Sequence, residues 1–182
     1  MKAHPFIPDV MFDGIHDITP EYLQNAGIRA VVLDIDNTLV TYGMPEPTED
    51  VIAWIDALRG AGVAVSLASN NDRDRVELFN AKLGVFATYK SGKPSPRAVL
   101  AACRHFGVTP EEVAVIGDQI FTDVLCARRA GAHAILVSPL PYPENLFFKC
   151  KRALEKPFIR SYRKRHAEAS DDSMKKGDRN DI

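Results

Sequence analysis

The feature of the sequence that most restricts its fold is a set of short apolar runs that recur along the chain. The runs are AVVLDI from residue 30, VAVSLAS from residue 63, VAVIG at 113–117 and AILV at 134–137. Apolar residues, many of them β-branched, occupy both parities of each run, which is typical of parallel strands covered on both faces.

Helix-start signals stand between these runs. Thr19, Ser95 and Thr109 each precede a proline, Thr48 precedes two acidic residues, and Asp72 can cap a further helix. The alternation predicts an α/β domain, a three-layer, Rossmann-like, doubly wound parallel sheet with helices on both faces. In such sheets ligands bind beyond the carboxyl ends of the strands, so functional residues are expected there.

The length of 182 residues suits one catalytic domain with smaller additions. We expect an N-terminal segment with a short helix at 1–29, the catalytic domain at 30–140, a basic amphipathic segment at 141–169 and a disordered tail at 170–182. A net charge of −1 indicates no long-range attraction to polyanions, so nucleic acid is not an expected partner.

Several features predict a cytoplasmic protein. Three cysteines without a paired spacing are interpreted as reduced thiols. No apolar run reaches the roughly 18 residues of a membrane-spanning helix, and the first residues lack the apolar stretch of a signal peptide.

Two pairs of acidic residues follow predicted strands. Asp34 and Asp36 end the first run on the same side of the chain, and Asp118 and Asp123 follow VAVIG. Neighbouring carboxylates beside a buried strand repel each other and are costly to desolvate unless a cation compensates them, which predicts a Mg²⁺ site. The alternative for Asp34 and Asp36 is a pair of solvated loop acids at a turn.

Polar residues at two other places fit a phosphoryl group. Ser69 and Asn70 end the second run with a hydroxyl and backbone donors, and Lys93 lies in a later loop before a proline. Taken alone, the Ser-Asn pair also fits a helix cap or turn, and the lysine also fits a solvated side chain.

The segments DIDNT, Ser-Asn-Asn, Lys-Pro and GDQIFTD, in this order, resemble the four motifs of the haloacid dehalogenase superfamily over about Ala30 to Val124. The resemblance implies that Asp34 attacks phosphorus and that Asp36 acts as general acid and base. With an aspartate at position 36, it favours phosphate-ester hydrolysis over dehalogenation.

The resemblance also implies the binding residues. The phosphate-binding residues would be Thr38, whose hydroxyl lies near the acid/base, together with Ser69, Asn70 and Lys93. The Mg²⁺ ligands would be Asp34, Asp36 through its backbone carbonyl, Asp118 and Asp123, the last in the outer shell.

The spacing between motifs leaves no room for a large cap domain. Eleven residues separate Asp36 from Thr48, and the stretch from Ser69 to Lys93 holds one helix and one strand. An open site suits a substrate presented by something larger, such as a lipid in a membrane, whereas small soluble substrates usually need more enclosure.

A narrower resemblance covers most of the chain. The segments FDGIHDITPEYLQNAGIRAVVLDIDNTLV and ENLFFKCKR, together with the motifs above, resemble the capless phosphatases that include YqeG-type proteins and phosphatidylglycerophosphate phosphatases. The resemblance implies hydrolysis of phosphatidylglycerophosphate to phosphatidylglycerol. The alternatives are a soluble phosphatase acting on a sugar phosphate, a nucleotide or a nucleic-acid end, and a catalytically silent scaffold.

Residues 146–165 alternate basic side chains with large apolar ones. This pattern is typical of a segment that binds peripherally to an anionic membrane, here the inner face of a membrane facing the cytoplasm. The alternative is an amphipathic helix that packs its aromatic side chains on the core.

Overall fold

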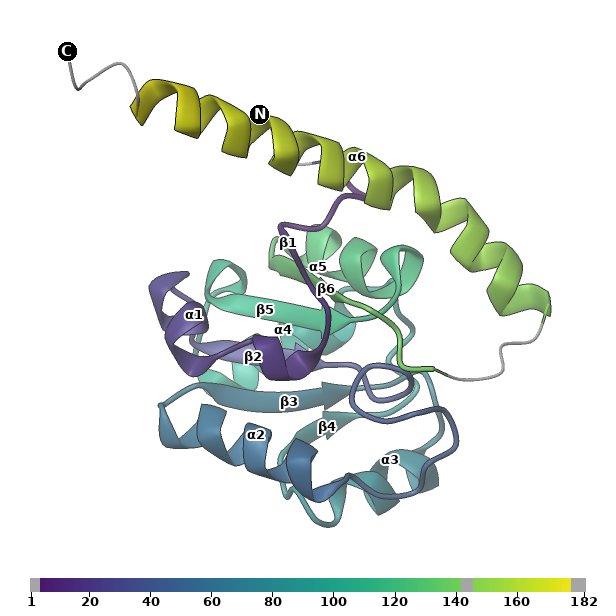
Figure 1. The fold of residues 1–182 in the computed structure, drawn as a ribbon. Helices are drawn as coiled ribbons and strands as arrows, with labels where there is room; N and C mark the ends of the chain where they lie inside the picture. Colours follow the sequence, from purple (N-terminus) through teal and green to yellow (C-terminus); the bar gives the residue numbers. More distant parts are fainter. Residues whose placement is uncertain (1–3, 142–145, 178–182) are drawn as a thin grey trace. The chain divides into compact units, whose positions relative to one another are not determined.

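The computed structural model of the protein describes residues 4–141 and 146–177. The chain divides into two compact units, Met1–Pro143 and Glu144–Ile182, and each is described by itself. The first unit contains a six-stranded sheet in the order β1-β6-β5-β2-β3-β4, and every neighbouring pair of strands is parallel (Figure 1). The strands are β1 (Val10–Phe12), β2 (Ala30–Leu33), β3 (Ala64–Ala68), β4 (Phe86–Thr88), β5 (Val113–Gly117) and β6 (His133–Val137).

The helices of the first unit follow the strands in alternation. They are α1 (Pro20–Asn25), α2 (Glu49–Gly60), α3 (Arg73–Asn80), α4 (Arg97–Phe106) and α5 (Leu125–Ala130). The N-termini of α1, α2 and α3 are capped by Thr19, Thr48 and Asp72. Each cap side chain accepts a hydrogen bond from the backbone N–H three residues later. These caps confirm the corresponding sequence predictions.

The central strands are apolar and fully enclosed. All residues of β2 and β5 are buried, as expected for parallel strands with a helical layer on each face. On one face, α2 buries Ile55 and Leu58 in the core cluster, and Trp54 donates a hydrogen bond from Nε1 to the carbonyl oxygen of Ile18 (2.9 Å). Helix α4 lies behind the sheet in the view of Figure 1, whereas α2 lies in front. The predicted three-layer fold is therefore confirmed.

The described residues of the first unit include no cap domain. Between β2 and α2 lie only residues 34–48, and between β3 and β4 the chain forms α3 alone. The site at the end of β2 is therefore not enclosed by an inserted domain.

Two elements differ from the sequence predictions. Strand β1 was not expected, because a three-residue strand leaves too short a pattern; it pairs with the edge of β6, with Val10 opposite Ile135. The proline after Thr109 begins only a 3₁₀ turn, Pro110–Glu112, instead of a longer helix.

The described residues of the second unit form one long helix, α6 (Leu146–Gly177), with Pro157 inside it. Its backbone is helical beyond residue 170, where the sequence analysis expected a disordered tail; residues 178–182 lie outside the described residues. Among the described residues, no helix combines the length and the apolar character needed to cross a membrane.

Candidate active site

Sheet register places Asp34 between two neighbouring strand ends. Leu33 of β2 lies opposite Ile116 of β5 and Leu67 of β3. The backbone N–H of Asp34 donates to the carbonyl oxygen of Ile116 (3.0 Å) and continues the ladder by one residue. The residues that follow β5 and β3 are therefore its neighbours.

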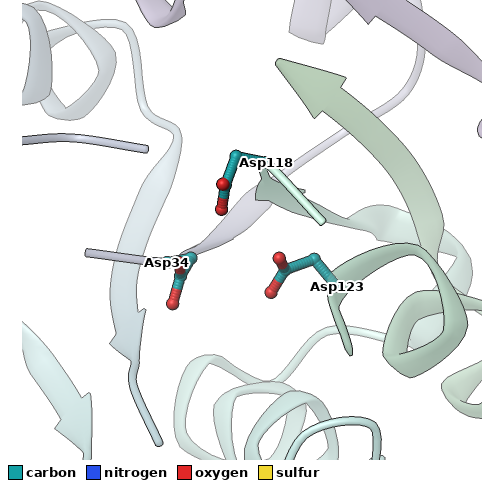
Figure 2. A group of neighbouring side chains, drawn as sticks. All are labelled: Asp34, Asp118 and Asp123. Carbon is teal, nitrogen blue, oxygen red and sulfur yellow. The ribbon is translucent and has the colours of Figure 1, made fainter. Parts of the chain in front are cut away.

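Three carboxylates converge at this edge. Asp34, Asp118 and Asp123 are buried, and each offers an oxygen atom within 4.8 Å of those of the other two. Figure 2 shows the three side chains pointing toward one another from separate segments. The first two follow β2 and β5 directly, whereas Asp123 lies in a π-helical turn, Ile120–Val124. The predicted grouping of these acids at strand ends is thus present in the structure.

The position of Asp123 depends on a close approach to the backbone at Gly117. A Cβ atom built on Gly117 would lie 2.2 Å from Cγ of Asp123 and 2.6 Å from its Cβ. The carboxylate of Asp123 is held in turn by the N–H of Gln119 and the hydroxyl of Thr122, both donating to Oδ2 at 3.2 Å. Glycine is therefore the residue that leaves room for the third carboxylate.

Lys93 joins two of the carboxylates. Its Nζ lies 2.5 Å from Oδ1 of Asp34 and 2.8 Å from Oδ1 of Asp123, and its side chain is 3% exposed. Asn70 fixes the lysine backbone, because its Oδ1 accepts the N–H of Lys93 (2.8 Å) and its Nδ2 donates to the carbonyl oxygen (3.2 Å). The side chain of Asn70, expected at the phosphate, thus positions the lysine loop.

Burial dominates the electrostatics of the site. It raises the pKa of Asp34 to about 7, with Lys93 opposing this shift and Asp123 and Asp118 adding to it. Burial lowers the pKa of Lys93, but Asp123 and Asp34 more than reverse this, so its pKa is raised. The ammonium is consequently charged at neutral pH.

Two hydroxyl residues lie at the same edge. Thr38 Oγ1 is 3.4 Å from Oδ2 of Asp34 and 3.3 Å from Oδ1 of Asp118. Its hydroxyl therefore lies beside the cluster of three carboxylates. No hydrogen bond between Thr38 and Asp36 is found among the described residues. Ser69 is buried after β3, and its Oγ accepts the N–H of Asn71 (3.1 Å).

Asp36 has a separate set of partners. Arg75 of α3 donates from Nη2 to Oδ1 of Asp36 (3.1 Å), and Asn71 donates from Nδ2 to Oδ2 (2.5 Å). Arg75 also donates from Nη1 to the carbonyl oxygen of Pro45 (3.3 Å). The cluster formed by the carboxylates of Asp34, Asp118 and Asp123 does not include the side chain of Asp36.

Neither partner of Asp36 was predicted from the sequence. Asn71 belongs to the Ser-Asn-Asn triplet, so its place at a strand end was a usable signal. Arg75 had none, because Arg73, two residues earlier, looks the same in sequence but pairs with Glu77 in an exposed ion pair.

The cluster of three carboxylates suits a hard divalent cation. When all three carboxylates are ionised, one ammonium leaves two excess negative charges in this buried site. Oδ1 of Asp123 is buried and lies 2.8 Å from the ammonium of Lys93 as an ion pair. Oxygen-only ligands with uncompensated charge fit Mg²⁺ or a similar ion.

Comparisons with known proteins identify the family of this chain. Residues 42–131 match the family model of the haloacid dehalogenase-like hydrolases. The chain is 35% identical to the "Probable phosphatase YqeG" of Bacillus subtilis over 88% of this chain and 93% of that protein.

Two further similarities are more distant. The chain is 27% identical to "Phosphatidylglycerophosphate phosphatase 1, chloroplastic/mitochondrial" of Arabidopsis thaliana, over 96% of this chain and about half (53%) of the length of the plant protein. A crystal structure of a HAD family hydrolase from Deinococcus radiodurans superposes with a TM-score of 0.54 at 19% identity, over 73% of this chain and 89% of that one, and shares its fold.

Proposed function

Because this chain belongs to the haloacid dehalogenase-like hydrolases and is a phosphatase of the YqeG type, we propose that it hydrolyses phosphomonoesters through a phosphorylated Asp34 with Mg²⁺ as cofactor. The observation that carries this proposal is the convergence of Asp34, Asp118 and Asp123, the first and last of which contact the buried ammonium of Lys93.

The first step is attack of Asp34 on phosphorus. Its carboxylate oxygen forms a bond to phosphorus while the bond to the leaving alkoxide breaks, which yields an aspartyl phosphate. Asp36 donates a proton to the leaving oxygen, so the product departs as an alcohol. Arg75 and Asn71 each donate to one oxygen of Asp36 and so fix the orientation of its carboxyl group.

The second step is hydrolysis of the aspartyl phosphate. Asp36, now deprotonated, accepts a proton from water, whose oxygen attacks phosphorus and displaces the Asp34 carboxylate. Lys93 stabilises the charge on the phosphoryl oxygens and on Asp34. Ser69 and the hydroxyl of Thr38 are the neighbouring phosphate-binding groups.

Asp34, Asp118 and Asp123 would hold Mg²⁺, together with the backbone carbonyl of Asp36. The ion would supply positive charge that offsets the crowded carboxylates and the incoming phosphoryl group.

The substrate that we propose is phosphatidylglycerophosphate, which makes the enzyme a phosphatidylglycerophosphate phosphatase of phosphatidylglycerol synthesis. Three observations support this choice: the similarity to the plant protein of that name, the absence of a cap over the described site, and the basic, apolar segment 146–165. Segment 146–165 would bind peripherally to the anionic inner face of a membrane, and the protein would otherwise be cytoplasmic.

A phosphate-release assay tests both parts of the proposal. The purified protein is offered an aryl phosphate and phosphatidylglycerophosphate in mixed micelles, with Mg²⁺ and with a chelator. We expect Mg²⁺-dependent release from both and none by Asp34→Asn. Release from the aryl phosphate with none from the lipid refutes the lipid substrate, as does a higher kcat/KM on a sugar phosphate or nucleotide. Activity retained by Asp34→Asn refutes the nucleophile.

A further inference from the structure

A surface pocket lies beside the loop that carries Lys93. It has a volume of about 410 Å³ and is bounded by α4 and by the residues after β4, from Thr88 to Ser91. Thr88 is the last residue of β4, so the pocket begins at the same edge of the parallel sheet as Asp34.

The polar lining of the pocket is basic. Lys90, Arg97 and Arg104 line it, and no acidic residue does. All three are exposed, and within residues 4–141 and 146–177 none of them forms an ion pair. Three like charges around one hollow produce a positive potential that favours an anion.

Large apolar side chains line the same pocket. Tyr89 is 45% exposed and Leu100 is 36% exposed, and Leu100 lies on α4 between the two arginines. A nucleic acid or a free phosphate would satisfy the cations but leave Leu100 in water. A ligand with an anionic group attached to an apolar body satisfies both.

The pocket wall and Lys93 belong to one hydrogen-bonded loop. Ser91 lines the pocket and donates from Oγ to Oδ1 of Asn70 (2.9 Å), the atom that also accepts the N–H of Lys93 (2.8 Å). The pocket is therefore connected to Lys93 of the active site through the hydrogen bonds of Ser91 and Asn70.

We propose that this pocket binds the phosphate headgroup of an anionic phospholipid in a bilayer, with Tyr89 and Leu100 facing the lipid at the interface. Its function is to dock the open catalytic edge on the membrane, independently of segment 146–165. The lipid nature of the substrate is taken from the proposed function, but binding is measurable without any hydrolysis.

The test compares two double variants that remove equal charge. Arg97→Gln/Arg104→Gln alters the pocket, and Arg29→Gln/Arg59→Gln is the matched control. The control side chains are 62% and 50% exposed and lie in surface ion pairs, and Arg59 also donates to the carbonyl oxygen of Leu83 (3.5 Å). Each full-length protein is sedimented with phosphatidylcholine vesicles that contain or lack phosphatidylglycerol. Thermal unfolding and hydrolysis of an aryl phosphate report on folding.

We expect the pocket variant to bind phosphatidylglycerol vesicles roughly 30-fold more weakly than the wild type, as two basic side chains at about 1 kcal/mol each imply. The control variant should bind within about twofold of the wild type. Equal binding by the wild type and the pocket variant overturns the proposal. So does a loss of vesicle binding confined to Arg160→Gln/Arg163→Gln in α6.

Two further outcomes separate this inference from the proposed substrate. Vesicle binding that is lost in the pocket variant supports the pocket even if phosphatidylglycerophosphate is not hydrolysed. Inhibition of vesicle binding by inorganic phosphate as strongly as by phosphatidylglycerol micelles would show a site for free phosphate and would overturn the lipid assignment.

Discussion

Replacing Gly117 with alanine is the sharpest test of how the active site is assembled. The new Cβ would lie 2.2 Å from Cγ of Asp123, whereas ordinary contact begins at 3.4 Å. Asp123 or its backbone must therefore move by roughly 1 Å, and its Cβ at 2.6 Å rules out a simple rotation of the carboxylate.

The magnitude follows from this displacement. Overpacking of this kind costs about 1–3 kcal/mol in the free energy of unfolding. At 2–4 °C per kcal/mol for a chain of this size, the melting temperature should fall by about 2–12 °C. A misplacement of about 1 Å at a catalytic group lowers kcat by roughly 100-fold, since Asp123 would leave its contact with Lys93 at 2.8 Å.

The assays are thermal unfolding and aryl phosphate hydrolysis in Mg²⁺, with Gly60→Ala as the control. Gly60 ends α2, and a Cβ there meets nothing within 4 Å, so alanine should be neutral or stabilise by up to about 1 kcal/mol. A Gly117→Ala protein with the melting temperature and kcat of the wild type would refute the reasoning.

Three other predictions concern charge. At pH 8 without metal, the free energy of unfolding of Asp34→Asn should exceed that of the wild type by an amount on the order of 4 kcal/mol. The pKa of Asp34 is raised from 3.8 to about 7 in the folded state, so this carboxyl group contributes stability below pH 3.8 and loses it as the pH rises through 7. Parallel pH–stability curves of the two proteins, measured by chemical denaturation, would contradict this. Mg²⁺ at about 100 times its Kd should stabilise the wild type by about 2.7 kcal/mol in thermal unfolding, and a shift of equal size in Asp118→Asn would exclude that residue as a ligand. Arg75→Gln removes a charge-assisted hydrogen bond to Asp36, so kcat should fall about 10- to 100-fold with KM unchanged. Arg75→Lys should recover part of this loss, and Arg73→Gln should have the kcat of the wild type. A change in KM alone would mean that Arg75 does not position Asp36.

The strand ends could be predicted because burial on both faces leaves a continuous apolar run in the sequence. Asp34 follows β2 and Asp118 follows β5, and the acidic residue after each strand was identified from the apolar run alone. Asp123 was expected in the outer shell of the metal site, and its oxygen lies within 4.8 Å of those of the other two acids. Its place depends on the π-helical turn and on Gly117, neither of which has a periodic signature.

The partners of Asp36 also could not be predicted from a pattern in the sequence. Arg73 and Arg75 occupy one helix two residues apart, and only the packing of α3 decides that the first pairs with Glu77 and the second reaches Asp36. Asn70 stays a predicted phosphate-binding residue, and the sequence did not indicate that both ends of its side-chain amide hold the backbone of Lys93. Strand β1 also escaped prediction, because its pairing with β6 is a contact between residues more than a hundred positions apart.

By itself, the sequence determined the layered α/β fold and the chemical groups at each strand end, because both follow from local patterns of burial and turn chemistry. Only the tertiary structure decided which carboxylates share the ammonium of Lys93, which arginine reaches Asp36, and where three basic side chains meet exposed apolar ones. Those relations join segments that are distant in the chain, and side-chain reach and close packing set them rather than any neighbouring residue.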